Sequence, residues 1–153
     1  MPKIETKYFG VIEFEESSVF HFRRGLPGFE EEKCFVPMEA PGYSPLVFLQ
    51  SVAQKELCFL ASAVQVVHPD YHLSVTAEDL AAIGLDDGRK IQIGRDVLAL
   101  TLLCVRDGSP VTANLMAPIV VNLHTRDALQ AVRHDSLYSH EYPVTALSKA
   151  ESC

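Results

Sequence analysis

Short apolar segments separated by turn residues constrain the fold of this chain more than any other feature of its sequence. The segments are residues 7–14, 18–22, 33–38, 46–52, 57–67, 97–105, 116–123 and 128–132. Several alternate apolar and polar residues as half-buried strands do, and 57–67 has the composition of a strand buried on both faces. Turns are predicted at Pro41-Gly42, Asp87-Gly88 and Asp107-Gly108. Strands at this short spacing favour a barrel or sandwich over alternating βαβ units.

Only one segment has the start and stop signals of a helix. Thr76-Ala77-Glu78-Asp79 matches a capping box, and Gly84 ends the short apolar pattern that follows it. The chain has 153 residues, which is the usual length of one domain. We therefore expect a mostly β fold: a small closed or partly open antiparallel β-barrel with one short helix. It forms a single domain over 1–145, followed by a loose C-terminal tail at 146–153.

Two local features of the predicted sheet follow from individual residues. Glu15-Glu16-Ser17 lies between two strand-like segments, so a hairpin is expected there. Pro118 lies inside the segment 116–123, and proline cannot donate a hydrogen bond to a β-ladder. The segment is therefore predicted to be an edge strand or to contain a bulge. An edge strand offers unpaired backbone groups with which a small barrel can bind a partner.

Composition indicates a folded domain and argues against direct binding to nucleic acid. Hydrophobic residues make up 48% and charged residues 22%, as in ordinary globular proteins. The 13 Lys and Arg against 20 Asp and Glu give a formal net charge of -7, which repels phosphate backbones. Glutamates cluster at Glu13, Glu15 and Glu16 and again at 30–32. Each cluster is either a solvated face or a surface that meets a basic partner.

The cysteines and the N-terminus favour a cytoplasmic protein. Cys34, Cys58 and Cys104 each lie in an apolar run, where a reduced thiol behaves as a small hydrophobe, and Cys153 is expected to be a free thiol in the tail. The first residues are charged and show no apolar signal region, and no segment reaches transmembrane length. We expect neither secretion nor a membrane partner.

A search for catalytic and cofactor motifs leaves one alternative open. His68, Asp70 and His72 could belong to a small metal-dependent hydrolase, although Pro69 argues against the helix that would align two histidines four residues apart. His134-Asp135-Ser136 contains the residue types of a hydrolase triad, but adjacent residues rarely converge on one proton-transfer line. No zinc, phosphate-binding or dinucleotide motif occurs in the sequence, so no cofactor is predicted.

Five segments together resemble the FliW family of flagellar assembly factors, in order and in spacing. They are Thr6–Gly10, Gly25-Leu26-Pro27-Gly28-Phe29, Phe48–Val52, Thr112–Asn122 and His134–Tyr138. The stretch from Asn114 to Ile119 is the most specific, whereas the Gly-Leu-Pro-Gly turn is generic. The resemblance covers residues 4–143. Arg23-Arg24 and the tail sequence depart from the expected pattern without weakening it.

The resemblance implies a regulator that binds proteins and catalyses no reaction. Its members are expected to bind flagellin and to sequester the RNA-binding translational repressor CsrA, which relieves repression of flagellin synthesis. While flagellin occupies the factor, the repressor is free; after flagellin export, the released factor captures the repressor. The acidic charge of this chain suits a partner whose RNA-binding face is basic.

Two segments are predicted to form the surfaces that recognise these partners. The candidate residues are Leu26, Pro27, Phe29, Glu30, Glu31, Glu32, Asn114, Leu115, Met116 and Ile119. The three glutamates would supply charge to the surface. For Phe29 and Ile119, packing in the core is an equally open interpretation. The sequence does not assign any of these residues to one partner or the other.

Overall fold

The computed structural model describes residues 1–85 and 90–144, and they form a mostly β fold, as predicted. The predicted turn at Asp87-Gly88 and the predicted tail at 146–153 lie outside the described residues. The strands are β1 Lys3–Thr6, β2 Gly10–Glu13, β3 Phe20–His21, β4 Cys34–Met38, β5 Val47–Ser51, β6 Cys58–Ala63, β7 Val97–Cys104, β8 Thr112–Ala113, β9 Ile119–Asn122, β10 Ala128–Gln130 and β11 Tyr142–Pro143.

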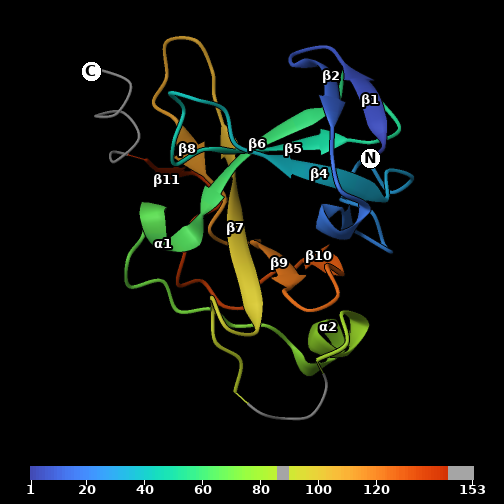
Figure 1. The fold of residues 1–153 in the computed structure, drawn as a ribbon. Helices are drawn as coiled ribbons and strands as arrows, with labels where there is room; N and C mark the ends of the chain where they lie inside the picture. Colours follow the sequence, from blue (N-terminus) through green and yellow to red (C-terminus); the bar gives the residue numbers. More distant parts are fainter. Residues whose placement is uncertain (86–89, 145–153) are drawn as a thin grey trace.

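The strands form one large antiparallel sheet and one separate hairpin (Figure 1). In the large sheet the order is β10-β9-β7-β6-β5-β4-β3, and β8 and β11 extend it beside the far end of β7. The eight residues of β7 make it the longest strand, and it pairs with β6 on one side and with β9 and β8 on the other. The hairpin of β1 and β2 projects beside β4 and β5.

The large sheet is not closed into a barrel, which corrects the closed form of the prediction. Its end strands β3 and β10 approach each other at a single parallel bridge between His21 and Asp127. There the His21 N–H donates to the carbonyl oxygen of Arg126 at 2.9 Å. One bridge joins the two edges without building a ladder between them. Of the two predicted forms, closed and partly open, the structure has the partly open one.

The described residues contain two short α-helices, not one. The predicted α2 spans Ala77–Ala82, and the Thr76 hydroxyl caps it by accepting from the Asp79 N–H at 3.1 Å. The unpredicted α1 spans Val64–Val67, because the predicted strand 57–67 turns into a helix after Ala63. A short 3-10 helix, η1, spans Glu16–Ser18. None of the helices in the described residues is long and apolar enough to span a bilayer.

Two details of the predicted sheet are wrong. The first hairpin turns at 7–9, not at 15–17. The Thr6 hydroxyl stabilises this turn, because it donates to the Gly10 carbonyl at 2.8 Å and accepts from the Phe9 N–H at 2.9 Å. Pro118 marks no edge, since β9 begins one residue after it and lies between β7 and β10. Its missing N–H therefore removes no bond from the ladder, while its carbonyl accepts from Ala131 at 2.8 Å.

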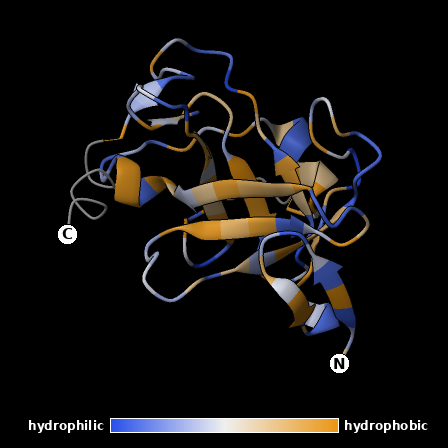
Figure 2. Ribbon diagram, turned by 90° about the horizontal axis from the view of Figure 1, so that it is seen from above, coloured by the Kyte–Doolittle hydropathy of each residue, from blue (hydrophilic) through white to orange (hydrophobic). Residues whose placement is uncertain are grey.

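Apolar residues predominate in the central strands, which are largely orange in Figure 2. Their side chains pack on both faces of the sheet. On one face, Leu49, Ala61 and Leu100 belong to a buried group that we call the first core cluster. On the other face, Ala99 packs with α1 and with Leu115 in the second core cluster. A smaller cluster lies beneath α2.

Cys34 and Cys58 are partly buried and Cys104 is exposed, all three as free thiols, so the predicted core position is wrong for Cys104.

Candidate partner-binding surfaces

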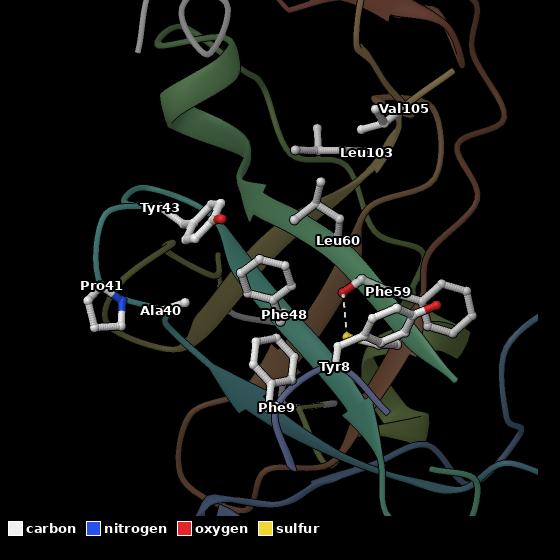
Figure 3. Close-up of a pocket in the computed structure, with 11 residues that line it drawn as sticks. Tyr8, Phe9, Ala40, Pro41, Tyr43, Phe48, Phe59, Leu60, Leu103 and Val105 are labelled. Atoms are coloured by element: carbon white, nitrogen blue, oxygen red, sulfur yellow. Dashed lines mark hydrogen bonds between the residues drawn. The ribbon is translucent and has the colours of Figure 1, made fainter. Parts of the chain in front are cut away.

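An apolar groove of about 910 Å³ opens on the second face of the sheet, beside the second core cluster (Figure 3). The β1–β2 turn, the loop between β4 and β5, and strands β5, β6 and β7 all contribute to it. Its lining residues are Tyr8, Phe9, Ala40, Pro41, Tyr43, Phe48, Cys58, Phe59, Leu60, Leu103 and Val105. Not one of these side chains is charged at neutral pH. Burial raises the pKa of Cys58 to about 11, so that its thiol is also neutral.

The groove exists because β6 and β7 separate at one end. Their register pairs Ala61 with Leu102 and continues towards Ala63, but it does not extend back to Cys58. Beyond Leu102, β7 pairs with β8 on its opposite side through Leu103 and Cys104. The Cys58 end of β6 and the Cys104 end of β7 are therefore not paired with each other. No strand fills the space between them, so the apolar side chains there remain uncovered.

Exposed aromatic side chains form the rim of the groove. Tyr8 is 61% exposed and Tyr43 57%, while Val105 on the far side is 61% exposed. The rings of Phe9 and Tyr43 meet the Phe48 ring edge to face, with centroids 5.1 and 6.1 Å apart. Figure 3 shows these rings on one side, Val105 on the other and Leu60 between them. Contiguous exposed apolar surface of this kind commonly marks a binding site for protein.

The Gly25–Phe29 loop is a tight, preorganised turn on the first face of the sheet. Gly25 has a φ of +66°, and a Cβ atom there would lie 2.4 Å from the Glu30 carbonyl oxygen, so only glycine fits. The Phe29 N–H donates to the Leu26 carbonyl at 2.7 Å. The Phe29 ring meets Phe59, a residue packed against the first core cluster, at a centroid distance of 5.2 Å.

The predicted residues of this loop divide into exposed and buried ones. Pro27, Phe29, Glu30 and Glu31 are exposed, whereas Leu26 belongs to the first core cluster. The Gly28 N–H donates to the Glu30 carboxylate at 3.1 Å and is the main cause of that carboxyl's lowered pKa. The loop therefore presents two carboxylates and an aromatic edge to solvent.

Glu32 is buried and connects the loop to the turn between β5 and β6. Its carboxylate accepts from the Ser51 hydroxyl at 3.1 Å and from the Gln54 side-chain amide. Beside it the Gln50 amide donates to the carbonyl of Lys55 at 3.3 Å, while the other atom of that amide, Oε1, has no partner. These bonds hold the loop in place, and Glu32 adds little to the exposed charge.

The Asn114–Ile119 segment lies mostly inside the molecule. Leu115 is completely buried in the second core cluster, and Ile119 is completely buried in the first. The Asn114 side chain accepts from the Met116 N–H at 3.2 Å, and both residues are partly exposed. Of the two predicted segments, the loop presents more surface to a partner than this one does.

The His134–Tyr138 segment is fixed to the fold by the buried Arg133. The Arg133 guanidinium donates to the Asp135 carboxylate at 2.8 and 2.9 Å and to the His72 carbonyl at 2.6 Å. It also lies over the rings of Tyr71 and Tyr138, which stack at 4.4 Å. The hydrogen bonds from Arg133 lower the pKa of Asp135. The predicted turn around Asp135 is therefore a structural anchor.

The metal-site alternative gains no support. The His68 ring packs against Tyr138 and Tyr142 at centroid distances of 5.3 and 5.7 Å, and its buried Nδ1 has no hydrogen-bond partner. His72 is exposed. Within residues 1–85 and 90–144, no group of three or more His, Cys, Asp or Glu side chains is placed to hold a metal ion.

Sequence reasoning missed the groove. Phe48 lies within one of the segments that carry the family resemblance, but the sequence does not mark it as a site residue. The alternating pattern of 7–14 predicts Tyr8 and Phe9 inside a strand, but they lie in the turn between β1 and β2. Leu60 lies in the segment expected to be buried on both faces. The one available signal was the aromatic pair of Tyr8 and Phe9 directly before Gly10.

Comparison with known proteins gives concordant results over nearly the whole chain. The family model described as FliW protein matches residues 3–144. The flagellar assembly factor FliW of Bacillus licheniformis is 36% identical over 142 residues, with 92% of this chain and 95% of the relative covered. That of Bacillus subtilis is 35% identical over 151 residues, with 98% of this chain and 99% of the relative covered.

The fold agrees with the same family. A crystal structure of the flagellar assembly factor FliW superposes with a TM-score of 0.81 at 33% sequence identity, covering 94% of this chain and 96% of the other. The predicted resemblance is thus confirmed by sequence and by structure. This chain belongs to the FliW family of flagellar assembly factors.

Proposed function

We propose that this chain is a cytoplasmic regulator that acts by binding flagellin and the translational repressor CsrA, and not by catalysis. Its relatives are named as flagellar assembly factors, which implies protein partners in flagellar assembly. Both kinds of surface that such a role needs are present: an uncharged apolar groove and an acidic loop. The proposed domain boundary, with residues 1–145 acting as one unit, agrees with a family match over 3–144.

The observation that best supports this proposal is that the two surfaces lie on opposite faces of the sheet. Leu26 and Phe29 pack on the face of the first core cluster, and Glu30 and Glu31 extend from that loop. The groove opens on the other face. A basic RNA-binding protein is attracted by exposed carboxylates, which raise the association rate through electrostatic steering. We therefore place the repressor at the loop, with Pro27 and Phe29 as its apolar contacts.

Co-purification tests the partners directly. Affinity-tagged protein is incubated with extract of a flagellated host, and the bound fraction is identified by mass spectrometry. The expected result is recovery of flagellin and of CsrA in amounts comparable with the bait. If purified flagellin and purified CsrA both fail to bind the purified protein, the proposed function is wrong.

Charge reversal tests the acidic loop. The double variant Glu30→Lys/Glu31→Lys should slow association with purified CsrA by about tenfold at low salt and by much less at 0.5 M salt, because salt screens exposed charges. The matched control is Glu15→Lys/Glu16→Lys, which makes the same change of net charge beside η1. Equal association rates for the two double variants would show that the carboxylates of the loop do not attract CsrA.

A further inference from the structure

The groove has the charge character of a site for an apolar segment. All eleven lining residues are uncharged. Of the charged residues beside them, Glu39 lines a different hollow, and the Lys7 ammonium lies 5.4 Å from the ring centroid of Tyr8 at the rim. Burying the cations of a basic RNA-binding surface in such a groove would cost free energy without compensation. The groove therefore matches an uncharged polypeptide segment, and it does not match the basic partner proposed for the loop.

The backbone of β6 defines the conformation that this segment adopts. The Ser51 N–H donates to the Leu57 carbonyl at 2.9 Å, so Leu57, Phe59 and Ala61 turn their backbone groups towards β5. Cys58 and Leu60 consequently face the side of β7. At Cys58 that side is open, because the pairing with β7 begins only at Ala61. A strand inserted beside Cys58 would continue the sheet.

Side chains on either side of this open edge would hold an inserted strand. Successive residues of a strand point to opposite faces, so alternate apolar side chains of the segment would meet Phe48 and Leu60 in the floor of the groove. The exposed rings of Tyr8 and Tyr43 and the side chain of Val105 would close over it from the rim. Backbone hydrogen bonds supply affinity in this mode, and the pockets for alternate side chains supply specificity.

We propose that the groove binds an extended, apolar segment of unassembled flagellin as an added strand along β6. This rests on the proposed function, which makes flagellin a partner. A subunit awaiting assembly exposes apolar surface that contacts with its neighbours later bury, and a groove without charges shields such a surface. Flagellin and the repressor then contact different faces of the sheet.

Substitutions at the rim test the location of the site. Tyr43→Asp and Val105→Asp place a carboxylate in the groove at positions that are 57% and 61% exposed, so folding should be preserved. Each should weaken binding of purified monomeric flagellin by about tenfold or more, since an unpaired charge is buried on binding. The matched control is Val11→Asp on β2, outside the groove, where the side chain is 67% exposed.

Three outcomes would contradict one claim or the other, and they separate this inference from the proposed function. If wild-type protein does not bind flagellin, flagellin is not a partner, and that part of the proposed function is wrong. If wild-type protein and both rim variants bind flagellin equally, the groove is not the site. If Val11→Asp weakens binding as much as Val105→Asp does, the effect is one of general charge and the groove assignment is again wrong.

Hydrogen exchange tests the conformation of the bound segment without any substitution. Strand addition gives the Cys58 N–H a hydrogen-bond acceptor, so its exchange should slow by about tenfold or more when flagellin is bound at saturation. The Phe59 N–H, which faces β5, serves as the internal control and should change much less. A bound complex in which exchange at Cys58 is unchanged would exclude an added strand, and the segment would then lie in the groove as a helix or a loop.

Discussion

The second face of the large sheet has a covered half and an open half. In the covered half, α1 and the segment around Leu115 seal the strands, and Arg133 closes the edge with a buried guanidinium. In the open half, Phe48 and Leu60 have the same apolar character but only a rim of exposed rings above them. The comparison shows that apolar residues on one strand face can serve stability in one place and recognition in the next.

The covered half should respond to substitution with a large loss of stability. Leu115→Ala removes a completely buried side chain from the second core cluster, which should lower the free energy of unfolding by about 2–5 kcal/mol. Urea denaturation measures this value, and the affinity of the remaining folded protein for flagellin should be unchanged. A loss below 0.5 kcal/mol would show that the covered half is not packed as described.

The ion pair between the buried Arg133 guanidinium and the exposed Asp135 carboxylate, at the edge of the covered half, should have a smaller, pH-dependent effect. Arg133→Met retains an apolar stem but removes the donors to the Asp135 carboxylate and the His72 carbonyl, with an expected loss of about 1–3 kcal/mol at neutral pH. Arg106→Met, at an exposed arginine, is the control.

The pH dependence of this difference has a defined sign. Folding lowers the pKa of Asp135, so the stability gained from the pair is present above the carboxyl's unfolded pKa and is lost as the pH falls through its folded pKa. The difference in free energy of unfolding between wild type and Arg133→Met should therefore shrink from neutral to acidic pH, down to the part that the bond to the His72 carbonyl contributes. A difference that stays constant over this range would mean that Asp135 adds nothing to the effect.

Sequence predicted local turns and helix caps far better than either half of the second face. The capping residues at Thr76 and the turn glycine Gly25 act locally, so their positions in the chain specify structure directly. The segment 57–67 shows the limit: its continuous apolar character predicted burial on both faces, but Leu60 lines an open groove. Apolar composition shows that a side chain prefers contact, and it does not show whether the contact is made within the chain or with a partner.

The groove itself depends on long-range geometry that no local pattern encodes. It requires β6 and β7 to be unpaired before Ala61, at the Cys58 end of β6. It also brings the turn at Tyr8 next to residues some fifty and a hundred positions away, such as Leu60 and Val105. The same limit explains why α1 was missed. Val64 and Val67 have strand-like side chains, and they are helical because tertiary packing in the second core cluster overrides that preference.

The smallest expected effect is the one that tests the open half most sharply. Val105→Thr replaces an exposed methyl group by a hydroxyl of similar size, so the free energy of unfolding should change by no more than about 0.5 kcal/mol. Flagellin affinity should fall by about three- to tenfold, because the hydroxyl is desolvated only when a segment fills the groove. Val11→Thr on β2 should change neither quantity. If Val105→Thr instead costs as much stability as a substitution at Leu115, the open half is covered in solution, and the division of the second face into a structural part and a recognition part is wrong.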